Sequence, residues 1–291
     1  MPTSTGFIKN HITKFLMTKK IPFTKMSGAG NDFIIFDARK QEINLSTSQV
    51  SKLSNRKNIG CDQLIIIKNS SEADCFMEIY NSDGSLSGAC GNATRCVAAI
   101  LMNLLSNNLP KINEVKIETA AGILKCWQDG NFISVDMGIP NFNWQKIPLS
   151  QERNSQKISL HNFEFSCVNV GNPHAVTFIN QPLADKDFFE IGSKVENDSL
   201  FPERTNVEFA KILSDNLIEV RVWERGASET LACGTGACAV GILAIKNNLV
   251  KSKKITTRFK GGDLIIQWNG ENSAVIMTGG YEKTFDGIVE I

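Results

Sequence analysis

The chain has 291 residues, of which 42% are hydrophobic and 21% are charged, as is typical of a globular protein with room for two domains that each bury a core. Five of its 31 basic residues are lysines within the first 25 positions, which hold no acid, so 26 basic residues face 30 acidic ones in the rest of the chain. This slightly acidic balance argues against a nucleic-acid-binding function, and no apolar run approaches the roughly 20 residues of a membrane span.

Residues 1–20 form a basic extension that contains no acid. They lack the uninterrupted apolar segment of a secretory signal peptide, so we expect a disordered extension, or one that precedes a true start at Met17. The eight cysteines are then expected to stay reduced in the cytoplasm, as small buried hydrophobes or as chemical groups. No metal site is expected, because no C-x-x-C pair exists and the chain has only three histidines.

Short runs of β-branched and aromatic residues alternate with Gly and Asn turns along the first half of the chain, which predicts strands. These strands are expected at residues 30–36, 62–68, 75–80, 114–119 and 132–137. One helix is expected over residues 93–108. Because that run is apolar nearly all round, we expect the helix to be buried inside a wrap of strands.

A stretch marked by Pro and Asn at residues 138–150 predicts the crossover to the second half. Strands are expected there at residues 175–179, 217–223, 254–259, 263–268 and 273–278. Helices are expected over residues 185–197 and 236–249. The second of these is again apolar on all sides, which is typical of a buried helix.

The two halves repeat each other in order. The stretch GACGNATRCVAAILM at 88–102 reappears as LACGTGACAVGILAI at 231–245, and four further pairs of segments match at an offset of 140 to 143 residues. Those pairs are 30–36 with 171–178, 79–85 with 222–228, 120–125 with 260–266, and 135–138 with 275–279. Chance does not supply five matches in order, so the chain is predicted to contain an internal duplication.

The duplication predicts an α/β (α+β) fold with two pseudo-symmetric domains. Each domain is expected to be a β-barrel-like wrap of mixed and antiparallel strands around its central buried helix. The expected boundaries are 21–136 for the first domain, completed by 280–291, and 137–279 for the second.

In each half a cysteine, Cys90 or Cys233, comes directly before the small-residue turn that opens the buried helix. Free N–H groups and the positive end of the helix dipole can hold a carboxylate there, and the same field lowers the pKa of the thiol. If the two domains face each other, both thiols are aimed at one carbon from opposite sides. This arrangement suits inversion of a stereocentre without a cofactor, because one thiolate removes the α-proton and the other thiol returns a proton.

A simpler interpretation applies to a single cysteine before a buried helix, which is more often a core residue than a catalyst. The other six cysteines are expected in the core: Cys61, Cys75, Cys96, Cys126, Cys167 and Cys238. A loose G-x-G-x-x-A pattern at 234–239 lacks a good preceding strand and a counterpart in the first half. We therefore expect no nucleotide site there.

Six separated motifs together resemble the diaminopimelate epimerase family: KMSGAGNDFIIFD, GCDQLIII, YNSDGSLSGACGNATRC, GNPHAVTF, TNVEFA and VWERGASETLACGTGACA. The resemblance extends from about Ile21 to the C-terminus. It implies a cofactor-independent isomerase that interconverts LL- and meso-diaminopimelate in the synthesis of lysine and peptidoglycan precursors. We expect a small-molecule substrate, neither nucleic acid nor membrane as partner, and leave a homodimer open.

The resemblance also assigns roles to residues that match the motifs. The expected acid–base pair is Cys90 and Cys233, and His174 and Glu224 are expected to position the reacting ammonium group. Backbone donors to the reacting carboxylate are expected at Gly91, Asn92, Gly234 and Thr235. The distal amino acid end is expected to contact Asn31, Asn81, Asn172, Asn206 and the guanidinium of Arg225, with Gln63 lining the site.

The first cysteine turn departs from the family pattern at two positions. Ala89 and Ala93 replace the more usual Gln and Gly on either side of Cys90, Gly91 and Asn92. They change the edge of the turn without touching the thiol or its two backbone donors, so catalysis is still expected.

Two other functions stay open. A proline racemase or hydroxyproline epimerase of the wider two-cysteine group would not need polar groups for a second amino acid end, whereas this chain has the asparagine set and Arg225. A non-catalytic protein could use the two helix N-termini to bind an anion. Exchange of the substrate α-proton, and a comparison of diaminopimelate with proline, distinguish these functions.

Overall fold

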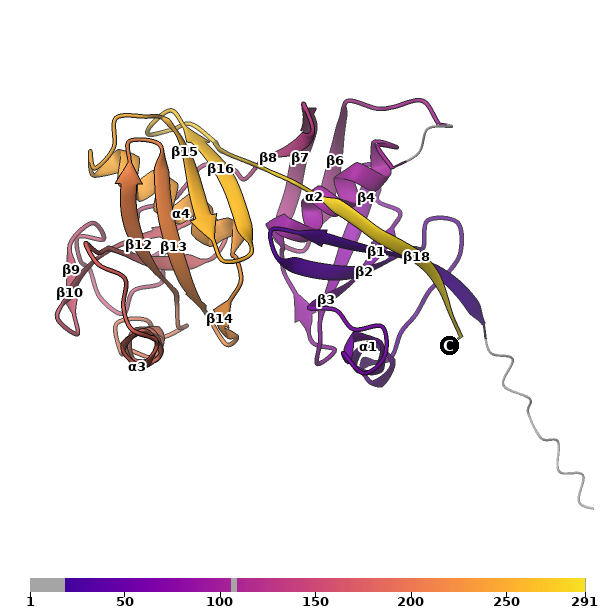
Figure 1. The fold of residues 1–291 in the computed structure, drawn as a ribbon, viewed down its shortest axis with the longest axis horizontal. Coiled ribbons are helices and arrows are strands. Elements are labelled where there is room, and N and C mark those ends of the chain that lie inside the picture. Colours follow the sequence, from indigo (N-terminus) through magenta and orange to yellow (C-terminus); the bar gives the residue numbers. More distant parts are fainter. Residues whose placement is uncertain (1–18, 106–108, 291) are drawn as a thin grey trace, which may run out of the picture.

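The computed structural model describes residues 19–105 and 109–290, so the predicted extension at 1–20 lies almost wholly outside the described residues. Figure 1 shows two lobes side by side, each with strands around one central helix. The central helices are α2 (Gly91–Leu101) and α4 (Gly234–Lys246). Hydrogen bonds join the strands of both lobes into one 18-stranded sheet. The predicted fold class is therefore confirmed.

The first lobe is built mainly from the first half of the chain. Besides α2 it contains β1 (Lys20–Gly28), β2 (Asn31–Asp37), α1 (Thr47–Ser54), β3 (Gln63–Lys68), β4 (Cys75–Asn81), β5 (Leu86–Ser87), β6 (Glu114–Thr119), β7 (Gly122–Asp129) and β8 (Phe132–Asp136).

The second lobe repeats this order of elements around α4, with one additional strand at its beginning. It contains β9 (Ile158–Leu160), β10 (Phe163–Asn169), β11 (Pro173–Phe178), α3 (Asp185–Glu196), β12 (Asn206–Ser214), β13 (Leu217–Glu224), β14 (Ser228–Thr230), β15 (Lys254–Phe259), β16 (Gly262–Trp268) and β17 (Val275–Gly279). The last strand, β18 (Glu282–Glu290), returns to the first lobe (Figure 1) and pairs antiparallel with β1. This return supports the domain boundaries predicted above, which we keep as a proposal.

Strand pairing repeats the sequence duplication element by element. β2 runs parallel to β3 as β11 runs parallel to β12, and β4 runs parallel to β6 as β13 runs parallel to β15. The β2–β3 and β11–β12 pairs have the same register. Phe33 lies opposite Gln63 in the first pair, and His174 lies opposite Asn206 in the second. Equivalent positions in the two lobes can therefore be compared one by one.

Both central helices are buried almost completely, as their apolar sequences predict. Each begins with a cysteine as its N-cap: the Cys90 sulfur accepts from Ala93 N, and the Cys233 sulfur accepts from Gly236 N. The first helix is shorter than the predicted 93–108. It ends at Leu101 because Asn103 takes a left-handed conformation, with φ of 59°.

Several elements carry too weak a pattern to be predicted from the sequence. α1 buries only two of its eight residues, although a capping box between Ser46 and Gln49 marks its beginning. β18 buries only Val289, so its place is set by pairing with β1 rather than by alternation of apolar residues.

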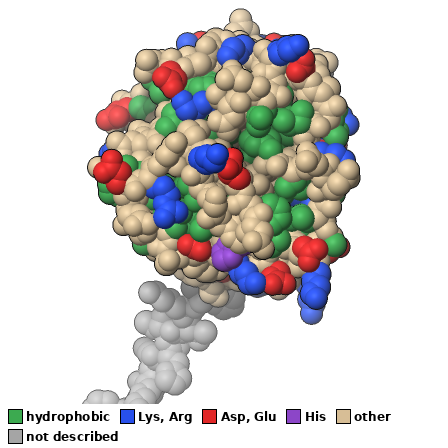
Figure 2. All heavy atoms as spheres, turned by 90° about the vertical axis from the view of Figure 1, so that its left-hand side faces the viewer, with side chains coloured by type: hydrophobic (Ala, Val, Ile, Leu, Met, Phe, Trp, Pro, Cys, Tyr) green, Lys and Arg blue, Asp and Glu red, His purple; other side chains and the backbone are tan. Residues whose placement is uncertain are grey.

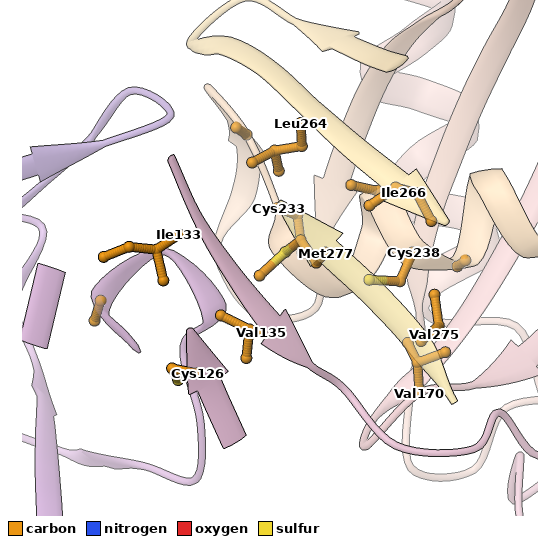
Figure 3. Close-up of a cluster of buried hydrophobic side chains, with 14 of the residues drawn as sticks. Cys126, Ile133, Val135, Val170, Cys233, Cys238, Leu264, Ile266, Val275 and Met277 are labelled. Carbon is orange, nitrogen blue, oxygen red and sulfur yellow. The ribbon is translucent and has the colours of Figure 1, made fainter. Parts of the chain in front are cut away.

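The lobes are joined where β8 pairs antiparallel with β17. Figure 3 shows side chains of both strands, among them Val135 and Met277, in one apolar cluster with Cys233 and Cys238. A Cβ atom built on Gly91 would lie 2.8 Å from Met277 Cε, and one built on Gly234 would lie 3.1 Å from Met277 Sδ. Met277 therefore packs beneath the N-termini of both central helices.

The outer face of the second lobe mixes Lys and Arg with Asp and Glu side chains, with apolar areas between them (Figure 2). Because charges of opposite sign are interspersed on this face, it does not form the continuous positive surface that would attract nucleic acid. Within residues 19–105 and 109–290, no helix is both long enough and apolar enough to cross a membrane.

Two neighbouring residues of β18 test how the returning strand stabilises the first lobe. Val289 is 8% exposed and packs in the core with Ile21 and Phe23, whereas Ile288 is 68% exposed. We expect Val289→Ala to lower the free energy of unfolding by about 2 kcal/mol. Ile288→Ala is the control, with an expected change within about 0.5 kcal/mol. Urea unfolding of both variants measures the difference, and equal losses would contradict it.

Candidate active site

A cleft of about 1480 Å³ lies between the lobes and is lined by residues of both. Every site residue predicted above except His174 lines it: Asn31, Gln63, Asn81, Cys90, Gly91, Asn92, Asn172, Asn206, Glu224, Arg225, Cys233, Gly234 and Thr235. The fold thus brings together residues from both halves of the sequence. Their individual roles stay predictions.

The N-termini of α2 and α4 meet at the floor of this cleft. A Cβ atom built on Gly234 would lie 3.6 Å from Gly91 Cα and 3.6 Å from Asn92 Oδ1. The two cysteine caps engage the third N–H group of each helix, which leaves the first two N–H groups of each helix for a ligand. Two positive helix ends directed at one place favour a bound carboxylate.

Polar side chains of the first lobe hold one another along its wall. Gln63 Nε2 donates to Asn81 Oδ1 over 3.1 Å, and Asn92 Nδ2 donates to Asn31 Oδ1 over 2.6 Å. Asn31 Nδ2 in turn lies 3.4 Å from Asp62 Oδ2. These amides are fixed in direction by their neighbours, as a binding surface requires.

In the second lobe, Asn206 acts on the backbone. Its Nδ2 donates to Pro173 O over 2.8 Å, and its Oδ1 accepts from Arg225 N over 2.9 Å. The Asn206 amide therefore ties the first residue of β11 to the turn that presents Arg225. The Arg225 guanidinium donates to Glu203 O through Nη1, and the residue lines the cleft.

Glu224 and His174 lie at different depths. Glu224 lines the cleft and accepts a hydrogen bond from the Thr230 hydroxyl. His174 is wholly buried behind the wall, with Nδ1 2.7 Å from Glu208 Oε1 and Nε2 2.9 Å from Asn172 Oδ1. Its connection with the cleft therefore runs through Asn172.

Known proteins share this sequence over most of its length. Residues 23–143 and 166–284 match the family model for diaminopimelate epimerase. The chain is 45% identical over 258 residues to the diaminopimelate epimerase of Pelagibacter ubique, with 86% of this chain and 92% of that protein covered. It is 40% identical over 283 residues to that of Acetivibrio thermocellus, with 92% and 98% covered.

The chain belongs to the diaminopimelate epimerase family. Solved structures of other proteins share its fold at low identity. A phenazine biosynthesis protein of the PhzF family from Bacillus anthracis has a TM-score of 0.66 at 16% identity, with 94% of this chain and 100% of that chain covered. A hydroxyproline epimerase from Agrobacterium vitis with bound trans-4-hydroxy-L-proline has a TM-score of 0.63 at 16% identity, with 94% and 93% covered. These likenesses concern the fold alone.

The pKa of each cleft thiol is raised, which is opposite to the direction predicted from the sequence. Burial raises the pKa of Cys90 to about 11, and the charge of Glu224 adds to the effect of burial. Burial, Glu224 and Glu208 raise the pKa of Cys233 well above its ordinary value. The N–H groups of the helix turns lower both pKa values, but by less than removal from water raises them.

Burial also raises the pKa of the Glu224 carboxyl group, which is partly offset by hydrogen bonds from Thr230 and from the Cys233 thiol. Glu224 and Cys233 therefore lie near each other in the cleft. A carboxyl group whose pKa is raised beside a thiol holds its proton more tightly than a free carboxyl group and is suited to exchange it with that neighbour.

Two buried charged residues of this region were missed by the sequence analysis. Arg95 of α2 is wholly buried and donates to Gly91 O, Asn92 Oδ1 and Gly280 O, so it braces the first helix turn from behind. Glu208 of β12 is wholly buried as well. The available signal was a charged residue inside an apolar run, in ATRCVAAIL and in NVEFA. Within the described residues, no three His, Cys, Asp or Glu side chains are grouped as metal ligands.

The remaining six cysteines are all buried, as expected for core residues. Burial raises the pKa of Cys96, Cys126 and Cys238 to about 12. They are therefore less reactive than a thiol in water.

The raised pKa of Cys90 predicts slow alkylation. Because its thiolate is lost as pH falls below about 11, we expect the rate with iodoacetamide to rise about tenfold per pH unit between about pH 7 and about pH 9.5, without a plateau. Mass spectrometry of the peptide that contains Cys90, from protein without substrate, measures this rate. A short peptide thiol that titrates near about pH 8.5 is the control. If the alkylation rate of Cys90 reached its plateau at a lower pH than the rate of the peptide thiol, the helix field and not burial would determine the pKa of Cys90.

Proposed function

We propose that this chain epimerises diaminopimelate with Cys90 and Cys233 as its acid–base pair. As a member of the diaminopimelate epimerase family it is an isomerase, and the reaction is the interconversion of LL- and meso-diaminopimelate. The observation that carries the proposed mechanism is the pair of cysteines that cap two helices whose N-termini meet at Gly91 and Gly234.

The reacting carboxylate binds between the two helix ends in this proposal. It accepts hydrogen bonds from the N–H groups of Gly91 and Asn92 on one side and of Gly234 and Thr235 on the other. These donors also stabilise the negative charge that develops on the carboxylate when the α-carbon loses its proton.

The proton transfer uses both faces of the α-carbon. One cysteine, as thiolate, removes the α-proton and becomes a thiol, while the opposite thiol gives its proton to the other face and becomes a thiolate. The two cysteines exchange protonation states in each turnover, so the reverse reaction restores the starting state. Glu224, beside Cys233, positions the substrate ammonium and exchanges a proton with that thiol, and His174 supports the same side through Asn172.

The distal end of the substrate distinguishes this function from a proline-type racemase. Arg225 offers a guanidinium to the distal carboxylate, and the amides of Asn31, Asn81 and Asn172 lie along the same cleft. A substrate with a single amino acid end would leave these groups without partners, which is costly in a closed site.

We further propose that the protein works in the cytoplasm and without a cofactor. The eight free cysteines support a reducing compartment. A homodimer is the assembly to test, by light scattering of the purified protein.

Exchange of the α-proton tests the acid–base pair. In D₂O the wild-type protein should incorporate deuterium at the α-carbon of diaminopimelate and epimerise it. We expect Cys90→Ser and Cys233→Ser each to lose epimerisation by about 100-fold or more, because a hydroxyl is a much weaker acid–base group. Cys238→Ala, on α4 but away from the cleft, is the control. Wild-type exchange and epimerisation in both serine variants would refute the mechanism.

Substitution of Arg225 tests the substrate. We expect Arg225→Lys to lower kcat/KM for diaminopimelate by about 10- to 100-fold, because Lys cannot form the bidentate contact with a carboxylate. Proline is the comparison substrate for both proteins. Faster turnover of proline than of diaminopimelate by the wild-type protein would favour the proline-type function.

A further inference from the structure

The buried carboxylate of Glu208, on β12, has no role in the chemistry described so far. Its Oε1 lies 2.7 Å from His174 Nδ1, and both side chains are wholly buried. Its Oε2 is buried and has no hydrogen-bond partner within the described residues. Burial of a carboxylate with one oxygen unsatisfied is costly, so the group is not explained by stability.

The fold itself does not require a polar pair at this place. By strand register, Phe33 of the first lobe is equivalent to His174, and Ile65 is equivalent to Glu208. Phe33 and Ile65 are both buried and apolar. The same architecture is therefore completed by an apolar pair behind Cys90 and by an ionisable pair behind Cys233.

The carboxylate also contacts the turn that carries Cys233. A Cβ atom built on Gly236 would lie 2.7 Å from Glu208 Oε1, so the helix turn passes directly over the carboxylate. The N–H group of Gly236 is the one that donates to the Cys233 sulfur. The equivalent position in the first lobe is Ala93, and the residue equivalent to Glu208 in that lobe is the apolar Ile65. A carboxylate beside the first turn of α4 is favoured by the helix dipole.

We propose that Glu208 is a positioning residue for the Cys233 side of the site. An ionised carboxylate accepts hydrogen bonds and cannot donate them, so Glu208 keeps a hydrogen on Nδ1 of His174 and fixes the plane of the ring. The other ring nitrogen, Nε2, is then an acceptor, so it holds the side-chain amide of Asn172 at the cleft wall with the NH₂ group of that amide turned toward the ring. This inference deepens the proposed function and rests on it.

The chain Glu208–His174–Asn172 transmits a fixed orientation from the core to the cleft. In a hydrogen-bonded series of this kind, the carboxylate determines the tautomer of the histidine. The histidine in turn determines the orientation of the group that it contacts. The first lobe has no counterpart, because Phe33 and Ile65 form no hydrogen bonds through their side chains. The two thiols therefore work in half-sites that are positioned by different means.

The tautomer of His174 can be measured without any assay of activity. ¹⁵N-labelled histidine gives signals from only three residues, and the His174 signal is the one absent in His174→Phe. In the wild-type protein we expect the hydrogen on Nδ1. In Glu208→Ile, which copies the first lobe and removes the acceptor, we expect Nε2 to carry it in a measurable fraction of molecules. An unchanged His174 spectrum in Glu208→Ile overturns the proposal.

Kinetics then test whether Glu208 acts through His174. We expect the near-isosteric Glu208→Gln to keep its unfolding temperature and to lose between about tenfold and about 100-fold in kcat, with a smaller change in KM. Glu164→Gln, an exposed carboxylate of the same lobe, is the control with wild-type kcat. Wild-type kcat in Glu208→Gln overturns the positioning role.

A double-mutant cycle completes the test. His174→Phe with Glu208→Ile installs the first-lobe pair, so it should fold, and we expect it to be no less active than His174→Phe alone. An equal further loss from Glu208→Ile in both backgrounds would mean that Glu208 acts independently of His174. If the wild-type protein does not exchange the α-proton of diaminopimelate, the proposed function fails, while the NMR result still reports on the contact between Glu208 and His174.

Discussion

The close approach of two helix N-termini is the constraint on which the rest of the structure depends. Gly91 and Gly234 have no side chains, so the backbones of α2 and α4 come together above Met277. Two positive helix ends in one place repel each other, and only an enclosing framework keeps them there. The wraps of strands and the β8–β17 junction provide that framework. The anion site is therefore a property of the whole fold rather than of either lobe.

Duplication supplied the symmetry of the site, and a few substitutions then removed it. Phe33, Ile65 and Asn81 of the first lobe have ionisable counterparts in the second lobe, whereas Arg95 stands where α4 has Cys238. One thiol thus has a buried cation behind it and the other has buried carboxylates. Burial has the largest effect on the pKa of each thiol. Arg95 then lowers the pKa of Cys90, whereas Glu224 and Glu208 raise that of Cys233 further.

Much of the site could be read from the sequence, because its residues lie in turns with a repeated pattern. The cysteine turns and the buried helices follow from spacing and hydrophobicity alone. The direction of the thiol pKa shifts was predicted wrongly, since the helix field is visible in a sequence but the depth of burial is not. Residues 280–291 were expected to complete the first domain, but the strand β18 was not predicted, and the partner of His174 was missed. Both are defined by contacts between residues far apart in the chain.

The return of β18 to the first lobe has a consequence for how the protein is made. Lys20 pairs with Glu290, so the first lobe lacks one of its strands until synthesis reaches the last residues. The second lobe has all its strands by Gly279 and can fold earlier on the ribosome. A ladder between the two ends of a chain is slow to form, because the loop that it closes spans nearly the whole sequence. The half synthesised first is therefore the half that is finished last.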